Sequence, residues 1–161
     1  MGAKAKKEVN AVIQAEGERS VFETNIHGLN PEISKLLGRM RYRTSYGQNV
    51  LNHSIEVSHI AGLLASELGV DVNVAKRAGL LHDLGKSIDH EVGGSHVQIG
   101  LELARKYRES ANVIHAIAAR TNHIAPTTLV PWPGQAAGAI SAARHRARRP
   151  DIRTHQLRLE T

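Results

Sequence analysis

Three residues, of types that can ligate a divalent metal ion, stand out by their placement in the sequence. His82 and Asp83 stand side by side at the end of a segment rich in Ala and Leu, and His53 lies earlier in the chain. The chain has 10 His and no Cys, which excludes a disulfide framework, a thiolate-bound zinc ion and a thiol nucleophile. Two imidazoles and a carboxylate suit Mn²⁺, Mg²⁺, Fe²⁺ or Zn²⁺ and leave coordination positions open for water and substrate. This set predicts a catalytic metal site rather than a structural one.

His53 taken alone has two interpretations. It belongs to the row 53, 57, 60, 64 on the apolar side of a predicted helix. An imidazole there is either a core side chain with a hydrogen-bond partner or a ligand that points toward another helix. The His82-Asp83 pair favours the ligand. Adjacent helical residues diverge by about 100°, so both reach one ion only if it lies between two helices.

The elements that position these residues are predicted to be helices, because apolar residues recur every three or four positions and no segment shows sustained alternation. The 161 residues form one domain of ordinary size. Thr44 to Gln48 and residues 86–94 are expected to interrupt the helices, and the prolines between 126 and 133 break any helix there. The fold class is therefore all-α, with helices predicted over 3–26, 31–40, 48–68, 71–85, 95–107, 111–120 and 135–148.

Basic residues exceed acidic ones by 21 to 15, and the formal net charge is +6. Arginines gather at Arg39, Arg41 and Arg43 and again in residues 144–161. Such clusters suit phosphate-rich partners, and a solvated face is the alternative. No window is apolar for long enough to span a membrane, and no signal peptide follows Met1, so we expect a soluble, intracellular chain.

The motifs around these residues resemble a known family. His53 followed by His82-Asp83 resembles the HD superfamily of metal-dependent phosphohydrolases, named after its His-Asp pair. The run Arg-Tyr-Arg-Thr-Ser-Tyr-Gly-Gln-Asn-Val-Leu at 41–51, with 76–86 and 88–96, resembles the HD domain of bacterial ribonuclease Y. The likeness covers 5–117 and resumes at 135–149. It implies a connector helix at 1–28, an all-α HD-domain helical bundle at 29–149 that is atypical at 119–138, and a basic tail at 150–161.

The resemblance implies a metal-dependent endoribonuclease that cleaves single-stranded RNA and initiates mRNA turnover. The alternatives are an HD phosphohydrolase acting on nucleotides or cyclic nucleotides, and a catalytically inactive module for RNA binding or assembly. Intact members of the ribonuclease Y family carry a membrane anchor, a coiled coil and an RNA-binding KH domain, and they self-associate. We therefore expect a cytoplasmic homodimer whose present segment makes no membrane contact of its own.

The resemblance also implies roles for individual residues. The metal ligands would be His53, His82, Asp83 and His96. The catalytic residues would be His82, Asp83 and Lys86, with the lysine offsetting phosphate charge. The groups that bind RNA phosphates would be Arg39, Arg41, Arg43 and Lys86. A solvated Lys86 and a surface His96 are the alternatives, and His59 is expected at the surface.

Three departures from the family pattern fall at the expected metal ligands. Gly138 stands where the superfamily has a closing Asp, and Arg120 and Thr121 stand where the family has a His-His pair. His123 is a candidate substitute ligand. These changes predict a weakened site that holds one divalent ion rather than two. The ion is expected to be Mn²⁺, Mg²⁺ or Zn²⁺.

Overall fold

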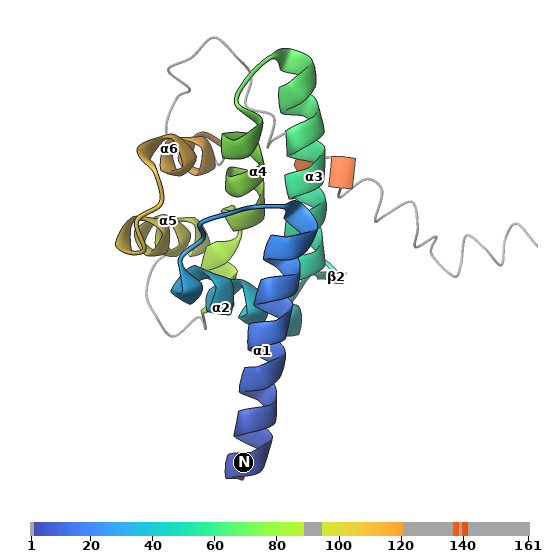
Figure 1. The fold of residues 1–161 in the computed structure, drawn as a ribbon, viewed down its shortest axis with the longest axis vertical. Coiled ribbons are helices and arrows are strands. Elements are labelled where there is room, and N and C mark those ends of the chain that lie inside the picture. Colours follow the sequence, from blue (N-terminus) through green and yellow to red (C-terminus); the bar gives the residue numbers. More distant parts are fainter. Residues whose placement is uncertain (1, 89–94, 121–136, 139, 142–161) are drawn as a thin grey trace, which may run out of the picture.

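The computed structural model describes residues 2–88, 95–120, 137–138 and 140–141. Helices dominate this part of the chain, which confirms the predicted all-α class (Figure 1). None of the described helices combines the length and the apolar character that a membrane span needs. The described elements are α1 (Ala3–Thr24), α2 (Pro31–Arg39), η1 (Met40–Tyr42), β1 (Thr44–Ser45), β2 (Gln48–Asn49), α3 (Val50–Leu68), α4 (Val72–Leu81), η2 (Leu84–Ser87), α5 (His96–Lys106) and α6 (Ala111–Arg120).

Local capping signals set most helix boundaries. Pro31 occupies the first position of α2, where its missing N–H costs nothing, and Gly69 ends α3 with a φ of 71°. In α2, α3, α4 and α5 a backbone N–H of the first turn donates to the side chain of the preceding cap residue, which is Asn30, Asn49, Asp71 or Ser95. Because these signals are local, the predicted boundaries near them are confirmed.

The predicted helix 71–85 ends earlier, at Leu81. The chain leaves the helix at His82, and Asp83 has a φ of −105° before the 3-10 turn η2 begins. The 3-10 turn packs closely against α5, because a Cβ placed on Gly85 would strike the backbone carbonyl of His96 at the start of that helix. His82 and Asp83 therefore lie in a turn between two elements rather than along a helix.

A small hairpin replaces the predicted break at 44–48. β1 pairs with β2 in antiparallel register, and the two turn residues, Tyr46 and Gly47, have φ angles of 51° and 76°. Two positive φ angles are typical of the tight turns that match the twist of a hairpin. Tyrosine is uncommon in this conformation, which is why the sequence did not reveal the turn.

α3 and α4 pack against each other and bring the two halves of the candidate site together. A Cβ added to Gly79 would lie 3.0 Å from Cα of Ser58, so the two helices approach closely. The hydroxyl of Ser58 donates to the carbonyl of Lys76 at 2.9 Å. This hydrogen bond joins the middle of α4 to the middle of α3. The core around it contains the fully buried Ile33, Leu37, Met40, Leu51, Leu80, Leu81, Leu84 and Ile117.

α1 packs on α2 through small residues. Gly17, Ser20 and Thr24 are its buried residues, whereas its larger apolar side chains are only half-buried or exposed. A Cβ on Gly17 would strike the backbone carbonyl of Ser34. The N-terminal part of α1 extends beyond the other elements (Figure 1). The helix is therefore held by its C-terminal half.

Glu16 joins α1 to η1. Its carboxylate lies 2.8 Å from the guanidinium of Arg19 and 3.1 Å from that of Arg41. The hydrogen bond from Arg19 is the main cause that lowers the pKa of Glu16, with partial burial opposing it and Arg41 adding to it. Glu16 is therefore anionic at neutral pH.

The close contact at Gly17 predicts whether replacing this glycine by alanine raises or lowers the free energy of unfolding. Gly→Ala in an exposed helix stabilises by about 1 kcal/mol. We expect Gly17→Ala to lower the free energy of unfolding instead, by about 1–3 kcal/mol, because the new methyl group overpacks the contact with α2. Urea unfolding measures the change. A variant as stable as the wild type would show that α1 and α2 do not approach this closely.

The pKa of Glu16 predicts how stability depends on pH. Its folded-state pKa lies below the unfolded value of about 4.3, so its stabilisation is present above that pH and is lost as the pH falls through the folded-state pKa. We expect Glu16→Gln to cost up to about 1 kcal/mol at neutral pH, since both arginines are partly solvated, and almost nothing near pH 2. Urea unfolding at both pH values checks this. Glu18→Gln on the same helix is the matched control and should cost little at either pH.

Candidate metal centre

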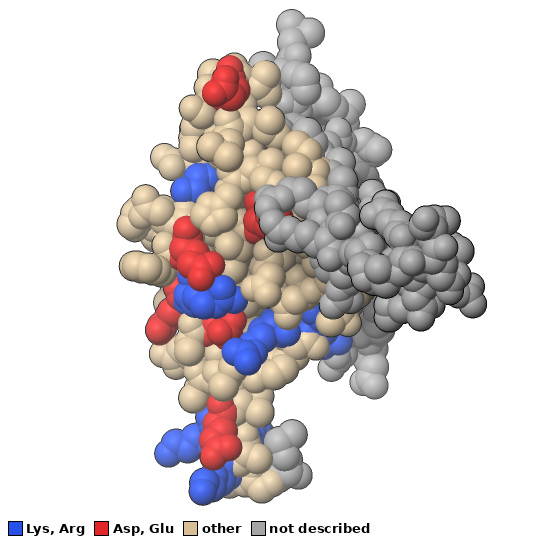
Figure 2. All heavy atoms as spheres, turned by 90° about the vertical axis from the view of Figure 1, so that its right-hand side faces the viewer, with Lys and Arg blue, Asp and Glu red and all other residues tan. Residues whose placement is uncertain are grey.

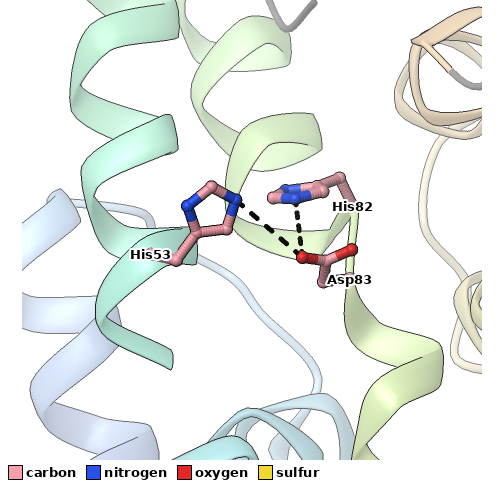
Figure 3. A group of neighbouring side chains, drawn as sticks. All are labelled: His53, His82 and Asp83. Atoms are coloured by element: carbon pink, nitrogen blue, oxygen red, sulfur yellow. Dashed lines mark ion pairs between the residues drawn. The ribbon is translucent and has the colours of Figure 1, made fainter. Parts of the chain in front are cut away.

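His53, His82 and Asp83 converge between α3 and α4 (Figure 3). His53 belongs to the first turns of α3, and the other two residues follow the end of α4. Each offers one ligand atom, and the three atoms lie within 4.8 Å of one another. The rings of His53 and His82 meet edge to face, with centroids 5.4 Å apart. The structure thus brings together three of the four predicted metal ligands.

His82 is fixed with its Nε2 atom toward Asp83. Its Nδ1 atom lies 2.6 Å from the carbonyl oxygen of Gly79. A carbonyl only accepts hydrogen bonds, so Nδ1 carries the proton and Nε2 of the neutral ring has the lone pair. Nε2 is buried and has no hydrogen-bond partner among the described residues, although it lies 2.9 Å from Oδ2 of Asp83. A buried nitrogen lone pair facing a carboxylate is an arrangement that a cation would stabilise.

The same carboxylate oxygen faces three nitrogen atoms. Oδ2 of Asp83 lies 4.0 Å from Nε2 of His53, 2.9 Å from Nε2 of His82 and 3.4 Å from Nζ of Lys86. Nζ of Lys86 also lies 3.5 Å from the hydroxyl of Ser45 in the hairpin. The donor set fits a divalent ion, because two nitrogen ligand atoms and one oxygen ligand atom surround one point.

His53 contacts two residues that the sequence analysis did not identify. Its Nδ1 atom lies 3.0 Å from the hydroxyl of Ser141, and that hydroxyl donates to Oε2 of Glu56 at 2.9 Å. Glu56 lies one turn after His53 on α3, so helical spacing alone could have pointed to it. Nothing local in the sequence connects Ser141 with His53.

His96 lies outside the cluster. It begins α5, and its Nδ1 atom lies 3.3 Å from the carbonyl oxygen of Gly85. Its role as a metal ligand stays a prediction. His59 is exposed on α3.

The arginines predicted to bind RNA lie on α2, η1 and the start of the hairpin. Arg39 is exposed, Arg43 is half-buried and Arg41 pairs with Glu16. Figure 2 shows basic and acidic side chains interspersed on one face, without a continuous basic field there. Charge on this face is therefore locally compensated.

The other predicted departures fall at the edge of the described residues. Gly138 is buried and belongs to a helical stretch with Ser141. Thr121, His123, the side chain of Arg120 and the basic tail lie outside the described residues. The predicted domain boundaries at 28 and 149 stay predictions.

Comparisons with known proteins agree with the motifs. A model of the HD domain family matches residues 50–158. Ribonuclease Y of Acetivibrio thermocellus is 58% identical over 160 residues, which are 99% of this chain and 30% of that protein. The ribonucleases Y of Clostridium botulinum (strain Langeland) and Thermoanaerobacter pseudethanolicus are each 60% identical over 160 residues, or 99% of this chain and 31% and 32% of theirs. The chain thus spans 30–32% of the length of these relatives. No solved structure matches it.

The family match includes His53, His82 and Asp83 and extends over more than half of the chain. The resemblance to the HD superfamily and to ribonuclease Y is thereby confirmed. This chain belongs to the HD domain family.

Proposed function

We propose that this chain is a metal-dependent endoribonuclease domain of the ribonuclease Y type that acts in mRNA turnover. The observation that carries the proposal is the convergence of Nε2 of His53, Nε2 of His82 and Oδ2 of Asp83 between two helices. The relatives named ribonuclease Y, at 58–60% identity, support RNA as the substrate. Single-stranded RNA, a cytoplasmic place of action and pairing with a second copy follow from the family resemblance.

A divalent ion supplies Lewis acidity and a water of lowered pKa, which is the chemistry that phosphodiester hydrolysis needs. His53, His82 and Asp83 would hold this ion and leave coordination positions open. One ion of Mn²⁺, Mg²⁺ or Zn²⁺ fits the three ligands, since Gly138 has no side chain to offer. His96 is the candidate ligand for a second ion.

Lys86 has a part in binding the substrate phosphate. Its side chain is 29% exposed and its Nζ contacts Oδ2 of Asp83. A cation bound to that oxygen would compete with Lys86 for it. Nζ would then be available to a phosphate oxygen, where it would stabilise developing negative charge. Arg39, Arg41 and Arg43 would hold more distant phosphates.

Removal of the shared carboxylate charge tests the metal site. We expect Asp83→Asn to weaken Mn²⁺ binding by more than the roughly 10–100-fold typical of losing an outer partner of a ligand, and to reduce RNA cleavage in parallel. Isothermal titration calorimetry and cleavage of a labelled oligoribonucleotide measure the two effects. Asp71→Asn is the matched control, because Asn also caps helices well, and both values should stay at the wild-type level.

The same preparation separates the alternative functions. Cleavage of the oligoribonucleotide and not of nucleotides or cyclic nucleotides supports the proposal. Hydrolysis of the small substrates alone would replace it with a nucleotide phosphohydrolase. RNA binding without Mn²⁺ binding or cleavage would replace it with an inactive binding module.

A further inference from the structure

We propose that Ser141 and Glu56 form a hydrogen-bonded chain that fixes the ring of His53 with its Nε2 lone pair toward the metal site. Ser141 is then a positioning residue, because it touches neither metal nor substrate. The inference rests on the proposed function of His53, His82 and Asp83 as a metal centre.

The direction of the hydrogen bonds follows from the donors available. The ionised carboxylate of Glu56 only accepts, so the single proton of the Ser141 hydroxyl is donated to Oε2 of Glu56. Toward His53 the hydroxyl oxygen can then only accept, and Nδ1 of His53 must carry the proton. The lone pair of the neutral ring is left on Nε2, the atom that faces Asp83.

This arrangement gives both histidines the same tautomer by different means. His82 donates from Nδ1 to the backbone carbonyl of Gly79, whereas His53 donates to a serine hydroxyl that is itself bonded to a carboxylate. Ligating histidines usually donate their other N–H to a carbonyl or a carboxylate, which orients the ring and raises its basicity. In this chain the serine relays the effect of the carboxylate.

Packing fixes the serine in this position. Ser141 is fully buried, and Ala137 in the same helical stretch packs with Val57 and Ala61 of α3. His53 and Glu56 are one helical turn apart on α3, so one hydroxyl can reach both side chains. The stretch that has Gly138 in place of the superfamily's Asp therefore contributes a hydroxyl that acts through His53.

The tautomer can be measured in the metal-free protein at pH 8 by ¹⁵N NMR of the imidazole nitrogens. We expect wild-type His53 to be protonated at Nδ1. In Ser141→Ala the acceptor is lost, so a mixture of tautomers should appear. In Glu56→Ala the freed hydroxyl can donate to Nδ1, so the Nε2-protonated form should increase.

Mn²⁺ affinity from isothermal titration calorimetry is the second readout. We expect Ser141→Ala to weaken binding roughly 10–100-fold and Ser141→Thr, which retains a hydroxyl, to recover most of it. Ser54→Ala is the matched control, since Ser54 is buried next to His53 and its hydroxyl has no hydrogen-bond partner among the described residues. Its affinity should equal that of the wild type.

Two results would overturn the inference: wild-type His53 protonated at Nε2, or Ser141→Ala binding Mn²⁺ as tightly as the wild type. If Ser141→Ala fails to fold, the tautomer of His53 in the wild-type protein still tests the inference. A wild-type protein that binds no Mn²⁺ would contradict the proposed function, while its His53 tautomer would still test the chain of hydrogen bonds.

Discussion

The arrangement of the candidate metal centre depends on one atom, Oδ2 of Asp83, which three other side chains face. The Nε2 atoms of His53 and His82 and the ammonium group of Lys86 face Oδ2. His53 belongs to α3, and His82 follows the last residue of α4. Facing lone pairs of a buried nitrogen and a carboxylate repel each other, so the fold must hold them together at some cost. The hydrogen bond from Nδ1 of His82 to Gly79 and the contact of Lys86 with Asp83 hold this pair in place, and the packing of α3 on α4 brings His53 to it. The close approach of Gly79 to Ser58 leaves the two helices little freedom to separate.

Backbone contacts at glycine place the rest of the site. Gly85 lies close to the backbone of His96, so η2 packs against the start of α5. In the turn before η2, Asp83 has a φ of −105° and departs from helical geometry. Lys86 of η2 lies 3.4 Å from the carboxylate of Asp83. The turn and its packing on α5 thus place Asp83 and Lys86 side by side.

The predictability of each feature depends on the range of the interaction behind it. Caps such as Asn30 and Asp71 act within one turn, so the sequence revealed those helix starts. The pattern of His53 and His82-Asp83 was sufficient to predict the cluster. The packing of η2 on α5 and the contact of Ser141 with α3 join parts of the chain that are distant in sequence, so neither could be predicted from the local sequence. The close contact of α1 with α2 at Gly17 likewise joins parts of the chain that are distant in sequence.

Under the proposed function, charge at the site links the bound cation to the RNA substrate. Asp83 and Lys86 carry opposite charges and Glu56 adds a negative charge behind His53, so these side chains do not by themselves attract a phosphodiester. Arg41 is likewise compensated by Glu16, whose lowered pKa keeps it ionised at neutral pH. A divalent ion would raise the summed charge of these side chains by two units, which favours a phosphodiester at short range. Substrate attraction at this site should therefore depend more on the bound ion than on the arginines around it.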